Sequence, residues 1–303
     1  MGNKPGLSET ICAAICASGA AACGTVSRAV LEPVMTDAQR AQLALRVPEW
    51  RTVFCAAFPY FANVPAPRHA ISRYAWGLDY HKVLAQRLTP AAEHLRALGA
   101  RAEVLVDASP VPERAAALYA GIGILGDHGL VIVPPYGSYV FLGTIVTDSE
   151  DPDAPLTQTP AIAQCAHCGA CRAACPSGAL APEGFHSERC LSHLSQKKGD
   201  LSPWEQALLQ QNDCLWGCDA CQEACPYNRD PHETTLPEFR EALIQTLSQG
   251  QLNGLSNREF QRRYGTRAFA WRGPAVLRRN LELLAKSESE TQRAFRHEKG
   301  NDL

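Results

Sequence analysis

The sequence lacks any apolar run of the roughly 18 residues that a transmembrane helix needs, so we expect no membrane span. It also lacks an excess of either charge. The formal net charge is −2, so no global electrostatic field attracts nucleic acid to the chain. Methionine is scarce, with two residues, and there is no low-complexity tract. At 303 residues the chain is long enough to bury a sizeable core in about two domains.

Cysteine, by contrast, is abundant, with 13 residues. A first run with the spacing C-x2-C-x2-C-x3-C precedes a proline and contains Cys165, Cys168, Cys171 and Cys175. A second run, C-x2-C-x3-C, also precedes a proline and contains Cys218, Cys221 and Cys225. Two such runs are typical of a ferredoxin with two 4Fe–4S clusters, in which the fourth cysteine of a run binds the other cluster. Zinc sites and a secreted disulfide framework fit this spacing poorly.

Spacing identifies seven cluster ligands and leaves the eighth open. A symmetrical ferredoxin would place a cysteine three residues before Cys218, where the chain has Leu215. Cys214 is one residue away from that position, and Cys190 lies 15 residues after Cys175. From spacing alone, Cys190 and Cys214 are equal candidates.

Residues 1–150 have the pattern of an α/β domain. Apolar runs predict strands at 53–58, 103–106, 130–133 and 139–146, and apolar periodicity predicts helices at 79–98 and 112–120. Pro90 would either kink the first of these helices or start a second one. The small, Ala-rich stretch at residues 11–23 weakly resembles a signal-peptide core, but an amphipathic helix is the better interpretation.

The stretch from Asp148 to Pro160 is rich in Asp, Pro and Thr, which predicts a domain boundary. We therefore expect three domains, at residues 1–150, 151–233 and 234–303. The last should contain helices at 234–248 and 274–286.

The order of several further blocks resembles the epoxyqueuosine reductase family. The resemblance spans roughly residues 50–285, and several blocks in one order are more specific than a cysteine motif alone. The matching blocks are Arg73–Lys82, Val106–Arg114, Gly121–Gly123, Tyr136–Gly143, both cysteine runs, Arg189–Cys190 and Phe260–Asn280.

The resemblance implies an α/β (α+β) N-terminal cobalamin-binding domain, then a ferredoxin-like double-cluster domain and short C-terminal helices. It implies a short form without the C-terminal helical-repeat extension of many members. The expected protein is a cytoplasmic oxidoreductase that reduces epoxyqueuosine to queuosine in tRNA. Its cofactors would be cobalamin and two 4Fe–4S clusters, with electrons from an external donor of the flavodoxin or ferredoxin type.

The resemblance also assigns site residues. One cluster would take Cys165, Cys168, Cys171 and Cys225. The other would take Cys175, Cys190, Cys218 and Cys221, so Cys190 is favoured over Cys214. The proton donor falls on Asp107, and the cobalamin contacts fall on Tyr80, His81, Gly137, Ser138 and Tyr139.

To work as an acid at neutral pH, Asp107 would need a pKa raised by burial against the corrin or apolar walls. Its position after a predicted strand and before a helix suits a catalytic group. The alternative is that Asp107 caps the helix that begins near Pro112.

Three departures from the family pattern concern the substrate. Residues 24–50 lack the glycine-rich, methionine-containing segment of the family, and we expect the helical extension to be missing. Ile124 and Asp127 stand where members usually have Trp and Lys. Two other functions therefore stay open: a dehalogenase-like cobalamin reductase acting on another small molecule, and a non-catalytic electron-transfer or cobalamin-handling protein.

A basic stretch, Arg258–Arg279, contains seven arginines with interleaved aromatic residues. It could bind tRNA phosphates and stack bases. Alternatively, its aromatic side chains pack inside the protein and its arginines form an ordinary solvated surface.

Overall fold

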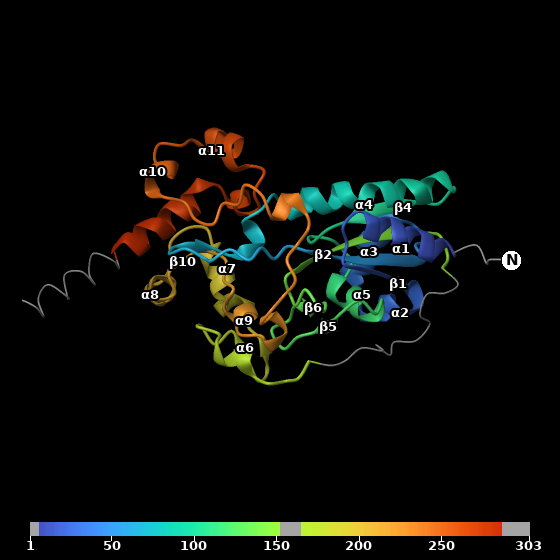
Figure 1. Ribbon diagram of the computed structural model, residues 1–303, viewed down its shortest axis with the longest axis horizontal. Helices are drawn as coiled ribbons and strands as arrows, with labels where there is room; N and C mark the ends of the chain where they lie inside the picture. The colour runs from blue at the N-terminus through green and yellow to red at the C-terminus, as the bar shows by residue number, and fades with distance from the viewer. Residues whose placement is uncertain (1–5, 152–164, 287–303) are drawn as a thin grey trace, which may run out of the picture. The chain divides into compact units, whose positions relative to one another are not determined.

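A computed structural model describes residues 6–151 and 165–286 (Figure 1). These residues form two compact units, each assembled from separate stretches of the chain. Unit 1 comprises the described parts of Met1–Ala62, Tyr80–Cys168 and Pro226–Arg240. Unit 2 comprises those of Asn63–Asp79, Gly169–Cys225 and Glu241–Leu303. The predicted boundary at 148–160 lies mostly outside the described residues, and the limits of the three predicted domains stay predictions.

Unit 1 is a layered α+β structure. Its strands are β1 (Ala22–Ser27), β2 (Thr52–Pro59), β4 (Ala102–Leu105), β5 (Ile124–Leu125), β6 (Val131–Ile132) and β7 (Val140–Thr147). Its helices are α1 (Leu7–Ala17), α2 (Arg28–Leu31), α3 (Asp37–Arg46), α4 (Tyr80–Ala97) and α5 (Glu113–Tyr119), with 3-10 turns at Glu32–Val34, Pro226–Asn228 and Pro237–Phe239.

The main sheet of unit 1 has the order β1-β2-β7-β4, and every neighbouring pair is antiparallel. All eight residues of β2 are buried, because helices cover both faces (Figure 1). On one face Val53 and Cys55 pack with Ala116 of α5. On the other face Gly143 lies against Leu84 of α4, where a Cβ would come within 3.3 Å. This alternation of faces is the period of two that a strand imposes.

Helix α4 confirms the predicted helix at 79–98. Pro90 lies inside it and does not divide it into two helices. Thr89 Oγ1 donates to the carbonyl of Ala85 at 2.7 Å in the turn before the proline. The buried side chains lie on one side of α4, among them Leu84, Leu88 and Leu95. The pattern of apolar residues therefore identified both the helix and its buried side.

Unit 2 consists of short elements. Its helices are α6 (Ala170–Ala173), α7 (Leu191–Ser195), α8 (Pro203–Gln211), α9 (Ala220–Glu223), α10 (Gln249–Leu252), α11 (Asn257–Tyr264) and residues 274–286. Its strands are β3 (Ala70–Ile71), β8 (Leu180–Ala181), β9 (Gly184–Phe185) and β10 (Cys214–Trp216), with 3-10 turns at Arg73–Ala75, Ser187–Arg189 and Ala268–Arg272.

Leucines from α7, α8 and the helix 274–286 form the core of unit 2, among them Leu194, Leu209 and Leu283. Asn280 is fully buried within it, and its Nδ2 donates to the carbonyls of Ser195 and Leu215 at 2.8 Å each. This amide satisfies backbone groups that would otherwise be buried without a partner. No helix among residues 6–151 and 165–286 combines the length and the apolar character needed to cross a membrane.

The predicted helix at 234–248 is wrong. Only a 3-10 turn forms there, at Pro237–Phe239. The backbone of this segment hydrogen-bonds to distant residues instead. The amide of Thr234 donates to Phe61 O at 2.7 Å, the carbonyl of Gln245 accepts from Ile71 N at 2.7 Å, and Ile244 N donates to Trp76 O at 3.0 Å. Tertiary partners thus override the local helical pattern.

Candidate active site and cluster ligands

Asp107 lies two residues beyond β4, where it meets the start of α4. Tyr80 Oη donates to Asp107 Oδ2 at 2.6 Å, and His81 Nε2 lies 2.9 Å from the same oxygen. Helix α5 begins at Glu113 with Pro112 as its N-cap and has no side-chain cap. The alternative in which Asp107 caps this helix is therefore wrong. The structure instead brings together three residues predicted for one site, Asp107, Tyr80 and His81.

In the structure the pKa of Asp107 is lowered rather than raised. The hydrogen bond from His81 lowers the pKa of Asp107 most, and the Tyr80 hydroxyl lowers it further, while partial burial opposes both. The His81 and Asp107 side chains keep 42% and 55% of their surface exposed, so burial is too weak to reverse the direction. Asp107 is thus an ionised carboxylate that accepts from Tyr80 Oη and contacts His81 Nε2.

A row of aromatic rings supports Tyr80, which sequence reasoning missed. Tyr80 stacks on Phe141 with ring centroids 4.4 Å apart, and Phe141 stacks on Tyr60 at 4.3 Å. Tyr60 meets Tyr139 edge-on at 5.8 Å. Tyr60, Tyr139 and Phe141 are buried, so the row is a rigid wall. It orients the Tyr80 hydroxyl towards Asp107.

The loop with the remaining predicted cofactor contacts is fixed by Asn228. Ser138 N donates to Asn228 Oδ1 at 2.7 Å, and Asn228 Nδ2 donates to Ser138 Oγ at 2.8 Å. Gly137 has a φ of +63° and leaves no room for a Cβ beside Asn228. Ser138 and Tyr139 are each 2% exposed. A bound group could therefore reach this loop only through its backbone, whereas Tyr80 and His81 offer partly exposed side chains.

A pocket of about 560 Å³ in unit 1 lies elsewhere, against Trp50. None of the predicted site residues lines it. Charged side chains that line it form ion pairs with each other, Arg28 with Glu32 and Arg51 with Glu150. These pairs leave little for a ligand, so we place the candidate active site at Asp107.

Four predicted cluster ligands converge within unit 2: Cys175, Cys190, Cys218 and Cys221. Burial raises the pKa of Cys221 to about 12, and the neighbouring thiols of Cys218, Cys190 and Cys175 add to this effect together with Asp219. Four thiols so close cannot all ionise without a cation among them. Their arrangement therefore fits an iron–sulfur cluster, which binds thiolates.

Cys214 differs from these four. It is buried in β10, and its Sγ donates to the carbonyl of Gly217 at 2.6 Å. Burial raises its pKa well above the usual value, and of the four thiols only Cys218 contributes to that shift. The hydrogen bond needs the protonated thiol, so this geometry favours Cys190 over Cys214 as the eighth ligand.

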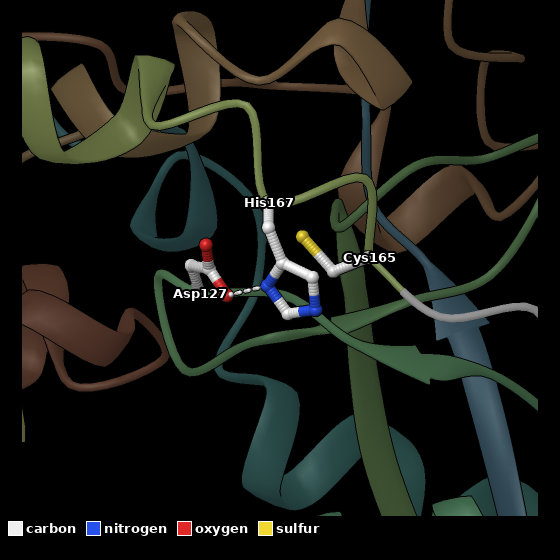
Figure 2. A group of neighbouring side chains, drawn as sticks. All are labelled: Asp127, Cys165 and His167. Carbon is white, nitrogen blue, oxygen red and sulfur yellow. Dashed lines mark hydrogen bonds and ion pairs between the residues drawn. The ribbon is translucent and has the colours of Figure 1, made fainter.

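The other predicted set is divided between the units, with Cys165 and Cys168 in unit 1 and Cys171 and Cys225 in unit 2. It stays a prediction. Within unit 1, His167 Nδ1 lies 2.8 Å from Asp127 Oδ1, and both side chains lie beside Cys165 (Figure 2). The ligand atoms of these three residues lie within 4.8 Å of one another. Asp127, which departs from the family pattern, thus has a histidine of the first cysteine run as its partner.

The basic stretch combines both interpretations offered for it. Phe260, Tyr264 and Phe269 are buried, so these aromatics belong to the core of unit 2. Three arginines are occupied with backbone carbonyls: Arg267, Arg278 and Arg279. Three others, here called the α11 arginines, are exposed: Arg258, Arg262 and Arg263. Trp271 is 60% exposed, and the Arg272 guanidinium lies 3.6 Å from its ring centroid.

Two family models match this chain. The 4Fe-4S double cluster binding domain matches residues 164–228, and the model named Epoxyqueuosine reductase QueG, DUF1730 matches residues 40–108. The first match contains both cysteine runs and Cys190. The chain therefore has a domain for two 4Fe–4S clusters, as predicted.

Proteins named epoxyqueuosine reductase are similar to most of the chain. That of Listeria monocytogenes is 34% identical over 86% of this chain and 70% of its own length. The chain belongs to the epoxyqueuosine reductase family. Family members from Bacillus subtilis and Gloeobacter violaceus are 32% and 36% identical over 79% and 75% of this chain. The chain spans 64% to 74% of the length of these three relatives.

Solved structures of the family are also similar. An epoxyqueuosine reductase with an epoxyqueuosine-modified tRNA-Tyr stem loop has a TM-score of 0.77 and 27% identity, over 92% of this chain and 80% of that one. The Bacillus subtilis enzyme with its catalytic aspartate loop swung out of the active site has a TM-score of 0.78 and 28% identity, over the same shares. The predictions of family, mixed α/β fold with a double-cluster domain, and oxidoreductase class are confirmed. The dehalogenase-like and non-catalytic alternatives are not favoured.

Proposed function

We propose that this chain reduces epoxyqueuosine to queuosine in tRNA. The main support is that Tyr80 and His81 hold the Asp107 carboxylate in a chain that belongs to the epoxyqueuosine reductase family. Because tRNA is the substrate, we place the activity in the cytoplasm.

The reaction sets the demands on the site. Epoxide plus two electrons and two protons gives alkene plus water, so both carbon–oxygen bonds break and the oxygen leaves as water. Cobalamin, which the family implies, would supply a cobalt centre that bridges the single electrons of the clusters and this two-electron step. Tyr80 and His81 fit a contact with such a group, because their side chains lie on the aromatic wall and stay partly exposed.

The protein's own residues manage the protons. The pair of His81 Nε2 and Asp107 Oδ2 shares one proton across 2.9 Å. We infer that the epoxide oxygen approaches Asp107 and receives this proton through the carboxyl group as the carbon–oxygen bonds break, while Tyr80 keeps the carboxylate oriented. The second proton comes from solvent water, and the oxygen leaves as water. General acid catalysis of this kind contributes about 10²–10⁴-fold in rate.

Electrons would reach the site one at a time through two clusters. We propose Cys175, Cys190, Cys218 and Cys221 as ligands of one and Cys165, Cys168, Cys171 and Cys225 as ligands of the other. The convergence of the first four thiols supports this assignment. An external donor of the flavodoxin or ferredoxin type completes the proposal.

The tRNA would bind through the α11 arginines, with Trp271 as a stacking surface. Their exposure and the cation–π contact of Arg272 with Trp271 support this choice. The rest of the basic stretch is left out, because Arg267, Arg278 and Arg279 hold backbone carbonyls. We also infer that the Asp107 loop can move away from Tyr80 and His81, as the catalytic aspartate loop of the Bacillus subtilis relative swings out of its active site.

The test is single-turnover reduction of an epoxyqueuosine-modified tRNA stem loop. The protein is reconstituted anaerobically with iron, sulfide and cobalamin, and nucleosides are analysed by mass spectrometry. We expect queuosine from the parent protein and a loss of about 10²-fold or more in rate for Asp107→Asn. Asp230→Asn makes the same chemical change at an exposed position and should keep full activity. Reconstituted protein that binds no cobalamin, or turns over only free small molecules, contradicts the proposal.

A further inference from the structure

The carboxyl group of Glu113 lies against the backbone of Asp107 and has no part in the function proposed above. Glu113 is the first residue of α5, and its side chain points back to the preceding loop. Its Oε1 accepts a hydrogen bond from Asp107 N at 2.8 Å. Among the described residues, this is the one hydrogen bond that the structure gives for the Asp107 amide.

Asp107 has an unusual backbone that needs such support. Its φ is +59°, in the left-handed region that residues with a Cβ adopt only at a cost in free energy. Two contacts from α4 hold its side chain, and one contact from α5 holds its backbone. The contacts from α4 hold only the carboxylate, whereas the contact from Glu113 holds the backbone of the loop itself.

We propose that Glu113 is a positioning residue. Its contact with the Asp107 amide, here called the latch, holds the loop in the geometry in which Asp107 meets Tyr80 and His81. Loss of the hydrogen bond that the Asp107 amide donates to Glu113 would free the loop to move away from Tyr80 and His81. This inference rests on the proposed function, because only that function gives the contact of Asp107 with Tyr80 and His81 a catalytic purpose.

The surroundings of Glu113 determine whether its carboxyl is protonated when it accepts the hydrogen bond from the Asp107 amide. Burial raises the pKa of Glu113 to about 8, and the charge of Asp107 adds to the shift, while the amide hydrogen bond and His81 oppose it. Cys55 of β2 also lies nearby, with its Sγ 3.9 Å from the Glu113 carbonyl. At neutral pH the carboxyl therefore carries a proton and accepts the amide through one oxygen. Glutamine offers the same neutral acceptor at the same reach, so Glu113→Gln should preserve the latch.

The experiment measures amide hydrogen exchange of residues 105–112 by mass spectrometry in the cluster-loaded protein without substrate. In Glu113→Ala the Asp107 amide should exchange roughly tenfold faster or more, since it has lost its acceptor. Glu113→Gln should exchange like the parent. Glu93→Ala removes an exposed glutamate of α4 and serves as the control. If Glu113→Ala does not fold, Glu113→Asp is used instead. Its side chain is one methylene shorter, so its carboxylate no longer reaches the Asp107 amide.

Turnover gives the second readout. Glu113→Ala should lower kcat for the modified stem loop about tenfold with little change in KM, and Glu113→Gln should restore kcat. Unchanged exchange in Glu113→Ala, or equally fast exchange in the Ala and Gln variants, overturns the latch. Because exchange needs no substrate, a protein that does not reduce epoxyqueuosine can still show the latch, so the two proposals fail separately.

Discussion

Replacing Gly137 by alanine tests the loop that contains three predicted cofactor contacts. A Cβ built at Gly137 would lie 1.9 Å from Asn228 Oδ1 and 2.8 Å from the carbonyl of Tyr227. The left-handed backbone alone costs a residue with a Cβ about 1 kcal/mol. The clash adds to this, because Asn228 has to move.

Moving Asn228 breaks both of its hydrogen bonds to Ser138, in a buried place. Each such bond contributes about 1 kcal/mol, and a buried group left without a partner costs about 1–3 kcal/mol. Together with the backbone strain, Gly137→Ala should lower the free energy of unfolding by roughly 3–5 kcal/mol.

The assay is urea denaturation of the cluster-loaded protein under anaerobic conditions, followed by circular dichroism. Gly99→Ala is the matched control, because Gly99 also has a left-handed φ, +91°, but no atom within 4 Å of its added Cβ. It should lose only the backbone cost of about 1 kcal/mol. Gly137→Ala combined with Asn228→Ala should lose less than the sum of the single variants, since the clashing atom is gone. Equal midpoints for Gly137→Ala and Gly99→Ala would refute the reasoning.

Four other outcomes can be measured directly. Cys190→Ser should remove about half of the bound iron while Cys214→Ser leaves it unchanged, and equal iron in both would reverse the ligand choice. Changing the α11 arginines to glutamine should weaken stem-loop binding and reduce the slope of log K against log salt by about 2, and an unaltered slope would exclude this surface. The raised pKa of Glu113 means that its contribution to stability falls as the pH rises from 4.5 to about 8, and Glu113→Gln should flatten that part of the curve. The lowered pKa of Asp107 means the opposite: its contribution is present above about pH 4 and is lost on further acidification, which Asp107→Asn should not show.

The parts of the fold that the sequence predicted are those that local pattern determines. The strand at 53–58 was identifiable because β2 is buried on both faces and so reads as one apolar run. Helix α4 was identifiable from its apolar period. The helix expected at 234–248 failed because its backbone groups find partners far away in the sequence, which no local pattern reports.

The candidate site divides in the same way. Cysteine spacing predicted seven ligands, because two runs of this spacing are typical of ferredoxins with two clusters, but it left the eighth ligand open. The direction of the Asp107 pKa could not be predicted, because it depends on a histidine 26 positions earlier that only the fold brings near. Asn228 and the aromatic row of Tyr60 and Phe141 gave no signal of their own, since each acts through a partner on another element.

The division of unit 1 into three stretches sets an order of events during synthesis. Residues 226–240 are made only after the whole of 169–225 has been added, which takes roughly 3–10 s at about 5–20 residues per second. Until then Ser138 lacks Asn228, and Arg87 lacks the carboxylate of Glu238. During this interval the sheet of the nascent chain therefore lacks the hydrogen bonds that fix its Gly137 loop.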